Sequence, residues 1–391
     1  MRYTWAGICS LLLLCWNTQV RSINPVFESN PMLPEGKKGT LSFGVSCLGF
    51  FKDNEYSGGI MKGYTLPGFR MQPKFVYYPL ENIKLEAGAH LARYWGASKY
   101  PCYAYSDIAE WQADQYQHGF HALPWFRAQM ALGKHWDIVL GNIYGAANHH
   151  LIEPLYNPEL NATADPEAGV QVLFHSRKFD LDIWGSWDSF IFQNDTHQEA
   201  FTFGVSGRAK WNDPSSRVHT YSTLQILAQH RGGEIDTITT RSVQTLMNGA
   251  VGTGVVYNAR CRYLKAVGAE VDLAGYYQQA GDLLPYDSGY GVYARAWADV
   301  CDFRLKAAFW HSEKFVPLFG SPFFGAVSSA SEGVFYPKQQ MLQWGAEYER
   351  NFGEHYAIGI EAEVYHHIGL GTSFSAGIYM KLNPEFILKK F

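Results

Sequence analysis

The sequence predicts an all-β fold, a transmembrane antiparallel up-and-down β-barrel of about 16 strands. Three observations predict it: apolar and polar residues alternate along most of the chain, the connecting segments are short and long in turn, and aromatic residues and glycine are abundant. Of the 391 residues, 16% are aromatic, 38 are glycine and 17% are charged, against roughly 25% charged in an average protein. This composition favours strands, turns and membrane interfaces.

The alternation has a period of two and is clearest near the C-terminus. Between residues 373 and 382, Phe374, Ile378 and Met380 oppose Ser373 and Ser375. A strand places such residues on opposite faces, so one face is apolar and the other polar. Sixteen stretches follow this pattern, two of them (136–144 and 247–257) weakly: 41–51, 70–78, 83–93, 125–132, 136–144, 170–177, 179–190, 201–211, 217–229, 247–257, 263–277, 291–300, 303–311, 341–350, 355–367 and 373–382.

The connections between these stretches distinguish a membrane barrel from a soluble sandwich. Every second connection is short, and those between them are mostly long. A barrel has short periplasmic turns and longer extracellular loops, whereas a sandwich has no reason to sort its loops in this way. The pattern therefore predicts an even strand number with both termini on the periplasmic side. The short connections are 79–82, 133–134, 176–178, 211–215, 258–262, 301–302 and 350–354, and the long ones are 52–67, 96–118, 146–167, 193–199, 230–242, 278–288 and 312–339.

The N-terminus resembles a secretory signal, with Arg2, an apolar stretch at 6–16 and a cleavage site after residues 20–22. The apolar stretch is about half of the ~20 residues that a spanning helix needs, so a retained anchor is the lesser alternative. We expect a signal peptide at 1–22, a periplasmic N-terminal segment at 23–38 and an outer-membrane barrel at 39–391. The expected location is the outer membrane of a Gram-negative cell.

Two phrases and the chain end carry a resemblance to known proteins. The phrases are 118–125 (HGFHALPW) and 141–148 (GNIYGAAN), and the chain ends in Phe391. In these features the chain resembles porin-type outer-membrane barrels of Bacteroidota. The resemblance covers residues 23–391 and concerns the architecture. The resemblance implies contact with outer-membrane lipid and recognition of Phe391 by the barrel-assembly machinery. It identifies no substrate family, so site residues must come from the residues themselves.

The polar face of each strand should line the lumen, which makes the lumen charged. Arg295, Arg304 and Lys306 fall on adjacent strands, and four glutamates fall on the next two, so separated walls of opposite charge would set up a field across the channel. The alternative is that these charges pair across neighbouring strands and fill the lumen. The candidate solute path is Arg127, Arg177, Asp180, Asp182, Arg208, Glu270, Asp272, Arg295, Arg304, Lys306, Glu347, Glu349, Glu361 and Glu363.

Three outer loops between residues 146 and 242 are rich in imidazole and carboxylate groups. They could converge at the extracellular mouth as a constriction or ligand site. Asp195, His197 and Glu199 would suit a divalent cation, although such residues are commoner in ordinary solvated loops. We therefore expect no bound metal or cofactor. The candidate mouth residues are His149, His150, Glu153, Asp195, His197, Glu199, His230, Arg231, Glu234 and Asp236.

The function expected first is a pore for small polar or charged solutes, because a polar lumen needs no special motif to conduct. A hydrolase at the outer rim and a structural or assembly component of a secretion system are the alternatives. No nucleophile elbow or zinc-protease motif occurs, so no catalytic residue is named. The net charge of -4, without a basic run, excludes a nucleic-acid partner. Cys261 and Cys301 should meet at the periplasmic rim and form a disulfide.

Overall fold

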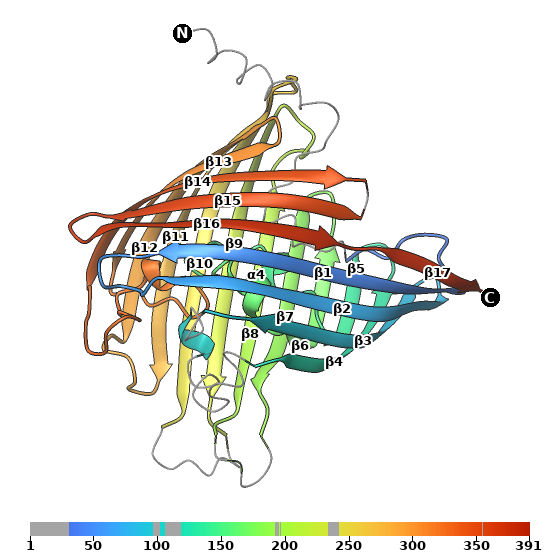
Figure 1. Cartoon of the computed structure of the whole chain (residues 1–391), viewed down its shortest axis with the longest axis horizontal. Helices are drawn as coiled ribbons and strands as arrows, with labels where there is room; N and C mark the ends of the chain where they lie inside the picture. Colours follow the sequence, from blue (N-terminus) through green and yellow to red (C-terminus); the bar gives the residue numbers. More distant parts are fainter. Residues whose placement is uncertain are drawn as a thin grey trace.

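The computed structural model describes residues 31–96, 102–105, 119–191, 195, 197–233, 242–353 and 355–391. The predicted signal peptide at 1–22 lies outside these residues, and only 31–38 of the predicted periplasmic segment are described. Among the described residues, seventeen strands form one antiparallel sheet that closes on itself (Figure 1). The strands are β1 (Thr40–Glu55), β2 (Tyr64–Leu80), β3 (Ile83–Tyr94), β4 (His121–Leu132), β5 (Trp136–Asn142), β6 (Ala168–His175), β7 (Phe179–Ser189), β8 (Ala200–Lys210), β9 (Val218–Arg231), β10 (Gln244–Asn258), β11 (Leu264–Ala280), β12 (Ser288–Val300), β13 (Phe303–Glu313), β14 (Lys338–Phe352), β15 (Tyr356–His367), β16 (Gly371–Leu382) and β17 (Glu385–Lys390).

The period-two alternation sorts side chains between the membrane and the lumen. On β16 the outward-facing Phe374 and Ile378 are 52% and 50% exposed, whereas the inward-facing Ser373 and Ser375 are 1% and 3% exposed. Apolar side chains thus face lipid, and polar ones face the interior, which is the reverse of a soluble core. The predicted barrel of about sixteen strands is confirmed, with one extra short strand.

The extra strand arises at the seam where the barrel closes. The outer half of β1 pairs with β16, from Cys47 opposite Leu382 to Glu55 opposite Phe374. Its periplasmic end pairs with β17, from Thr40 opposite Lys390 to Gly44 opposite Glu385. Pro384 separates β16 from β17, because a proline has no N–H to donate to a ladder. The sequence pattern ended the last strand at residue 382 and missed this continuation.

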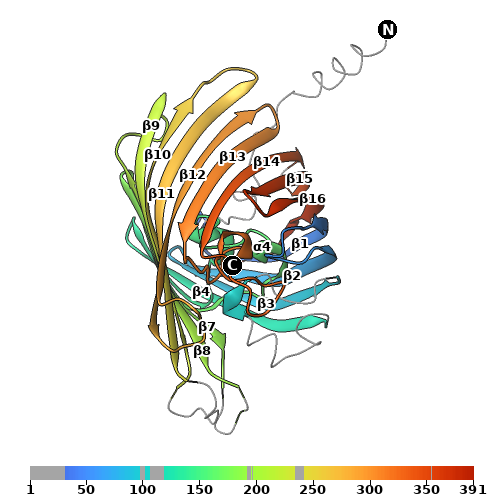
Figure 2. The ribbon, with the colours of Figure 1, turned by 90° about the vertical axis from the view of Figure 1, so that its left-hand side faces the viewer.

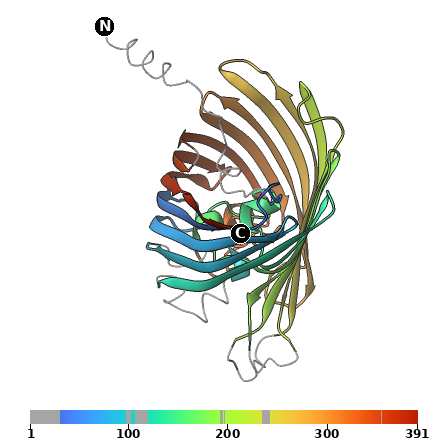
Figure 3. The same cartoon turned by 90° about the vertical axis from the view of Figure 1, so that its right-hand side faces the viewer.

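Two long extracellular connections fold back into the barrel. One joins β5 to β6 and carries the short helices η2 (Ala146–His149) and α4 (Leu160–Thr163). The other joins β13 to β14 and carries η3 (Pro322–Phe324). Figures 2 and 3 show α4 and these loop segments inside the ring of strands. Their backbones meet there: Tyr156 bridges to Phe319, and Asn157 N–H donates to Phe319 O at 2.8 Å.

An apolar core forms where these two loops contact the inner wall. Ile152, Leu155 and Leu160 come from the first loop, and Phe315 and Phe324 from the second, and all are at most 1% exposed. Burial of such side chains contributes roughly 1.5–3 kcal/mol each. The outer half of the lumen is therefore packed like a protein interior. The wall side of this core includes Tyr293, Trp310, Met341 and Tyr365.

Three amide side chains of the wall hold the loop backbones. Gln171 accepts from Tyr144 N–H at 2.9 Å and donates to Tyr144 O at 3.0 Å. Gln225 accepts from Ile152 N–H and donates to His150 O. Asn248 accepts from Leu318 N–H at 2.8 Å and donates to Val316 O at 2.9 Å. Each amide thus supplies the donor and acceptor that a neighbouring strand would supply to these irregular segments.

The predicted disulfide between Cys261 and Cys301 is wrong. Neither cysteine is in a disulfide in the structure. Cys261 lies in the turn between β10 and β11, where its thiol points toward Ala259 O at 3.5 Å. Its side chain is thus directed into its own turn, while Cys301 begins the next periplasmic turn.

Among the described residues, no helix is both long and apolar enough to cross a membrane.

Candidate functional site

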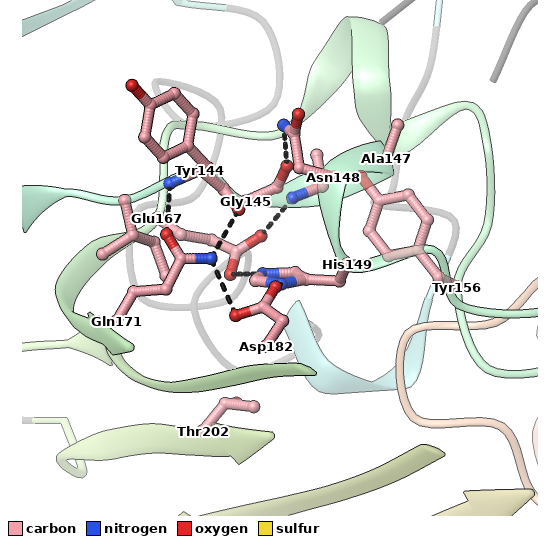
Figure 4. Close-up of polar contacts among 12 residues, drawn as sticks. Tyr144, Gly145, Ala147, Asn148, His149, Tyr156, Glu167, Gln171, Asp182 and Thr202 are labelled. Atoms are coloured by element: carbon pink, nitrogen blue, oxygen red, sulfur yellow. Dashed lines mark hydrogen bonds and ion pairs between the residues drawn. The ribbon is translucent and has the colours of Figure 1, made fainter. Parts of the chain in front are cut away.

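His149 anchors the first inserted loop to the barrel wall. It lies in η2 and is 2% exposed. Its Nδ1 lies 2.7 Å from Asp182 of β7, and its Nε2 lies 3.0 Å from Glu167, which ends the loop (Figure 4). The imidazole ring stacks on the Trp184 indole with centroids 3.5 Å apart. The indole packs over β8 at Gly204, where no side chain fills the space. A Cβ at position 204 would lie 2.1 Å from the indole.

Both ring nitrogens of His149 face a carboxylate, so the imidazolium form is favoured. Burial alone would lower the pKa of His149, but Glu167 and Asp182 outweigh it and raise the pKa to about 9. Burial likewise opposes the charge of Glu167, yet His149 and the Ala146 N–H hold the pKa of Glu167 below its usual value. A buried imidazolium that bonds two carboxylates in this way fastens the loop to the wall.

A second charged contact fixes the middle of the same loop. Lys306 of β13 bonds both Glu153 of the loop at 2.5 Å and Glu363 of β15 at 2.7 Å. Gln343 of β14 also donates to Glu153 at 2.7 Å. Removing one partner of a buried ion pair leaves the other charge buried and uncompensated. The position of this loop therefore depends on Lys306.

The predicted lumen residues mostly pair with their neighbours on the wall. Arg295 bonds Glu270 at 2.7 Å, and Arg304 bonds Asp299 through two nitrogens. These pairs match the filling alternative more closely than separated walls of charge. The prediction that Arg177 lines the lumen is wrong. Arg177 lies in the β6–β7 turn, its side chain is 80% exposed and it pairs with Asp213. The other predicted lumen residues, Arg127, Asp180, Asp182, Arg208, Asp272, Glu347, Glu349, Glu361 and Glu363, lie on the inner face of the strands.

The predicted mouth residues do not come together at one place. His149, His150 and Glu153 lie inside the barrel instead of at its mouth, because their loop folds inward. Arg231 also faces inward, is 3% exposed and bonds Ala104 O. His197 bonds Phe190 O at 3.0 Å, and Glu199 accepts from Trp187 at 2.7 Å, so both of these suggested cation ligands bond other groups. Glu234 and Asp236 lie outside the described residues, as do the chain neighbours of Asp195 at 192–194 and 196.

No group of three or more His, Cys, Asp or Glu side chains in the described ranges is placed to hold a metal ion.

One imidazole and one hydroxyl meet on the lipid-facing side of the outer rim. His230 is the penultimate residue of β9, and Thr245 lies opposite it on β10. Nδ1 of His230 is 2.8 Å from Oγ1 of Thr245. Trp187 and Phe201 flank the pair and are 53% and 37% exposed. The arrangement resembles a hydroxyl nucleophile beside its general base, with an aromatic surface for apolar chains.

Sequence reasoning named His230 and Glu199 here but missed Thr245. Thr245 precedes a stretch whose alternation is weak, so its face could not be assigned from pattern alone. A second pair of the same kind, His366 Nδ1 with Thr372 Oγ1 at 2.8 Å, lies at the outer ends of β15 and β16. The wall amides Gln171, Gln225 and Asn248 were also missed, because nothing in a sequence shows that a loop will turn inward.

The closed sheet, its lipid-facing apolar side and its long outer loops define an outer-membrane β-barrel of the porin type. OprD from Pseudomonas aeruginosa is similar in structure, with a TM-score of 0.50 and 8% identity over 95% of this chain and 98% of that chain. OccAB2 from Acinetobacter baumannii has a TM-score of 0.49 and 10% identity over 90% of this chain and 100% of that chain. At 8% identity, the likeness to OprD shows the fold alone.

The family follows from the sequence of the barrel. The model of the Lipid A 3'-O-deacylase-type family matches residues 33–391. The chain belongs to this family. No curated protein matches it.

Proposed function

We propose that this protein hydrolyses an ester bond that attaches an acyl chain to lipid A in the outer leaflet. The observation that carries the proposal is the contact between His230 Nδ1 and Thr245 Oγ1 on the lipid-facing rim. The ester bonds of such a lipid lie at the boundary of headgroup and acyl chains, which is the level of an outer rim residue. Membership of the Lipid A 3'-O-deacylase-type family supports the substrate class.

The proposed reaction transfers the acyl group to Thr245. Its Oγ1 attacks the ester carbonyl while His230 takes the hydroxyl proton. The bond between the carbonyl carbon and the sugar oxygen breaks, and the imidazolium returns its proton to that oxygen. Water then attacks the acyl-threonine ester with the same imidazole as base, which releases the fatty acid and restores the hydroxyl.

Neighbouring side chains support this assignment over the second imidazole–hydroxyl pair. The exposed rings of Trp187 and Phe201 offer the acyl chain an apolar surface beside His230.

The test uses the purified barrel in vesicles that contain lipid A, with mass spectrometry of the lipid. We expect loss of one acyl chain, a rate about 10²–10⁴-fold lower for His230→Ala and Thr245→Ala, and activity retained in Thr245→Ser. His366→Ala is the matched control and should keep the wild-type rate. Loss of activity in His366→Ala alone would move the site to β15 and β16. A wild-type protein that leaves lipid A intact contradicts the hydrolase.

A second candidate, a pore for small polar or charged solutes, is favoured by a cavity of about 420 Å³ inside the barrel. Arg295, Arg304 and Lys306 line it. Under this function the protein gives ohmic steps in planar bilayers, and replacing the three cations changes ion selectivity. Silent bilayers contradict it. The packed outer half of the lumen weighs toward the hydrolase.

The proposal also covers the export of the chain and its assembly into the outer membrane. Residues 1–22 would be removed as a signal peptide, 23–38 would remain on the periplasmic side, and the barrel-assembly machinery would bind the chain end. In support, Phe391 is 71% exposed and packs edge-on against Tyr77 with ring centroids 5.9 Å apart. N-terminal sequencing of the mature protein checks the cleavage: a first residue other than Ile23 contradicts it.

A further inference from the structure

A cavity of about 420 Å³ occupies the periplasmic half of the lumen, below the inserted loop. Its roof includes Asn161 of α4, and its wall includes Arg208 near the end of β8 and Arg295 in the second half of β12. The lipid-facing pair His230 and Thr245 lies at the other end of the barrel and outside it. The cavity is therefore separate from the site proposed for hydrolysis.

A row of side chains crosses the wall of this cavity from β8 to β12. The guanidinium of Arg208 stacks 3.8 Å from the ring centroid of Tyr221. The Tyr221 hydroxyl donates to Glu270, which also accepts from Arg295 at 2.7 Å. Tyr221 and Glu270 reach one another across β10 because Gly254 stands between them. A Cβ at position 254 would lie 2.4 Å from Tyr221 Cζ.

Four carboxylates that line the cavity besides Glu347 already accept hydrogen bonds or form ion pairs within the protein. Glu270 accepts from Tyr221 and Arg295, and Glu153 from Lys306 and Gln343. Asp180 pairs with Lys210 at 2.7 Å. Asp182 accepts from His149 and Gln171. A cation entering the cavity would have to compete with these bonds.

Several donors that line the cavity have no acceptor. Asn161 is 2% exposed, and its Oδ1 accepts from Ala147 N–H at 3.1 Å, which leaves Nδ2 buried without a partner. Nε of Arg295 is likewise buried without a partner. Within the described part of the chain, no carboxylate forms a salt bridge with Arg208, whose guanidinium is held only by the Tyr221 ring. Donors in excess of acceptors make the site complementary to an anion.

We propose that this cavity binds a small oxyanion, a carboxylate or a phosphate, that enters from the periplasmic side. Arg208 supplies the free positive charge, and Arg295 and Asn161 supply directed N–H groups. The Tyr221–Glu270 contact keeps both arginines in place. The proposal does not depend on the hydrolase, because it uses none of the lipid-facing residues.

The test titrates the full barrel in detergent with inorganic phosphate and, separately, with acetate, and follows binding by calorimetry. We expect saturable binding that Arg208→Gln weakens at least about tenfold, as loss of a charge-assisted hydrogen bond implies. Arg177→Gln removes the same charge from an exposed turn and should leave the affinity unchanged. Binding of phosphate alone identifies a phosphate site, and binding of both probes identifies a general oxyanion site.

Gly254→Ala gives a second, independent check, since it keeps every donor but forces Tyr221 to move. We expect a folded barrel with affinity reduced like that of Arg208→Gln. Equal affinity in wild type, Arg208→Gln and Gly254→Ala overturns the proposal, and so does the lack of saturable binding of either anion to the wild-type barrel. Lipid A hydrolysis should be the same in all these variants, which separates this outcome from failure of the hydrolase.

Discussion

The imidazole of His149 lies flat on the indole of Trp184, with centroids 3.5 Å apart and planes within 10° of one another. The same imidazole bonds Asp182 and Glu167 through its two nitrogens. One loop residue thus combines stacking, charge and two hydrogen bonds against the barrel wall. The position of the inserted loop depends on this contact.

Replacing His149 should destabilise the protein strongly. In His149→Ala, Asp182 and Glu167 remain buried without their cation, a change that typically costs about 3–5 kcal/mol. The exposed His355 lies in the β14–β15 turn, and His355→Ala should stay within about 0.5 kcal/mol of the wild type. Chemical unfolding in detergent micelles measures both. Equal unfolding midpoints for the two variants would show that the His149 contact does not stabilise the protein.

The same residue should make stability depend on pH. Its pKa is raised from about 6.5 in the unfolded chain to about 9 in the folded protein. A raised pKa means that the stabilisation is complete below pH 6.5 and is lost as pH rises through 9. The difference in unfolding free energy between wild type and His149→Gln should therefore shrink between pH 6.5 and 10. A difference that stays constant over this range would contradict the ionised contact.

Replacing a wall amide should loosen the loop without removing a charge. Gln225→Leu removes the acceptor of the buried Ile152 N–H, a loss that costs about 1–3 kcal/mol, and the donor that holds His150 O. We expect a lower unfolding midpoint and more frequent or larger openings in planar bilayers than the wild type gives. Gln340→Leu on the lipid-facing side of β14 is the control and should change neither. Unchanged bilayer traces for Gln225→Leu would show that the loop does not limit passage.

The barrel itself could be predicted because one local rule repeats along it. The alternation in 355–367 and 373–382, and the loop lengths, depend only on neighbours in sequence. The weak stretch 247–257 is confirmed as a strand, since β10 spans it. By contrast, β17 was missed, since its pairing with β1 joins the two ends of the chain.

The interior of the barrel could not be predicted, because it depends on loops that turn inward. His149 and Glu153 look like solvated loop residues in sequence, and only the structure brings them to Asp182 and Lys306. The contact of Tyr221 with Glu270 also has no sequence signal, since it passes over a glycine on the strand between them. Thr245 gained meaning only once β9 and β10 were in register.

The divided pairing of β1 gives the chain end a mechanical role. Thr40 to Gly44 have β17 as their partner on one side, and the Phe391 N–H donates to Gly39 O at 2.9 Å. Without β17, the N–H and C=O groups on this edge of β1 would lose their ladder partners, and an unpaired backbone group within a bilayer costs several kcal/mol. The short strand β17 thus acts as a clasp that completes the seam beside the periplasmic end of β1.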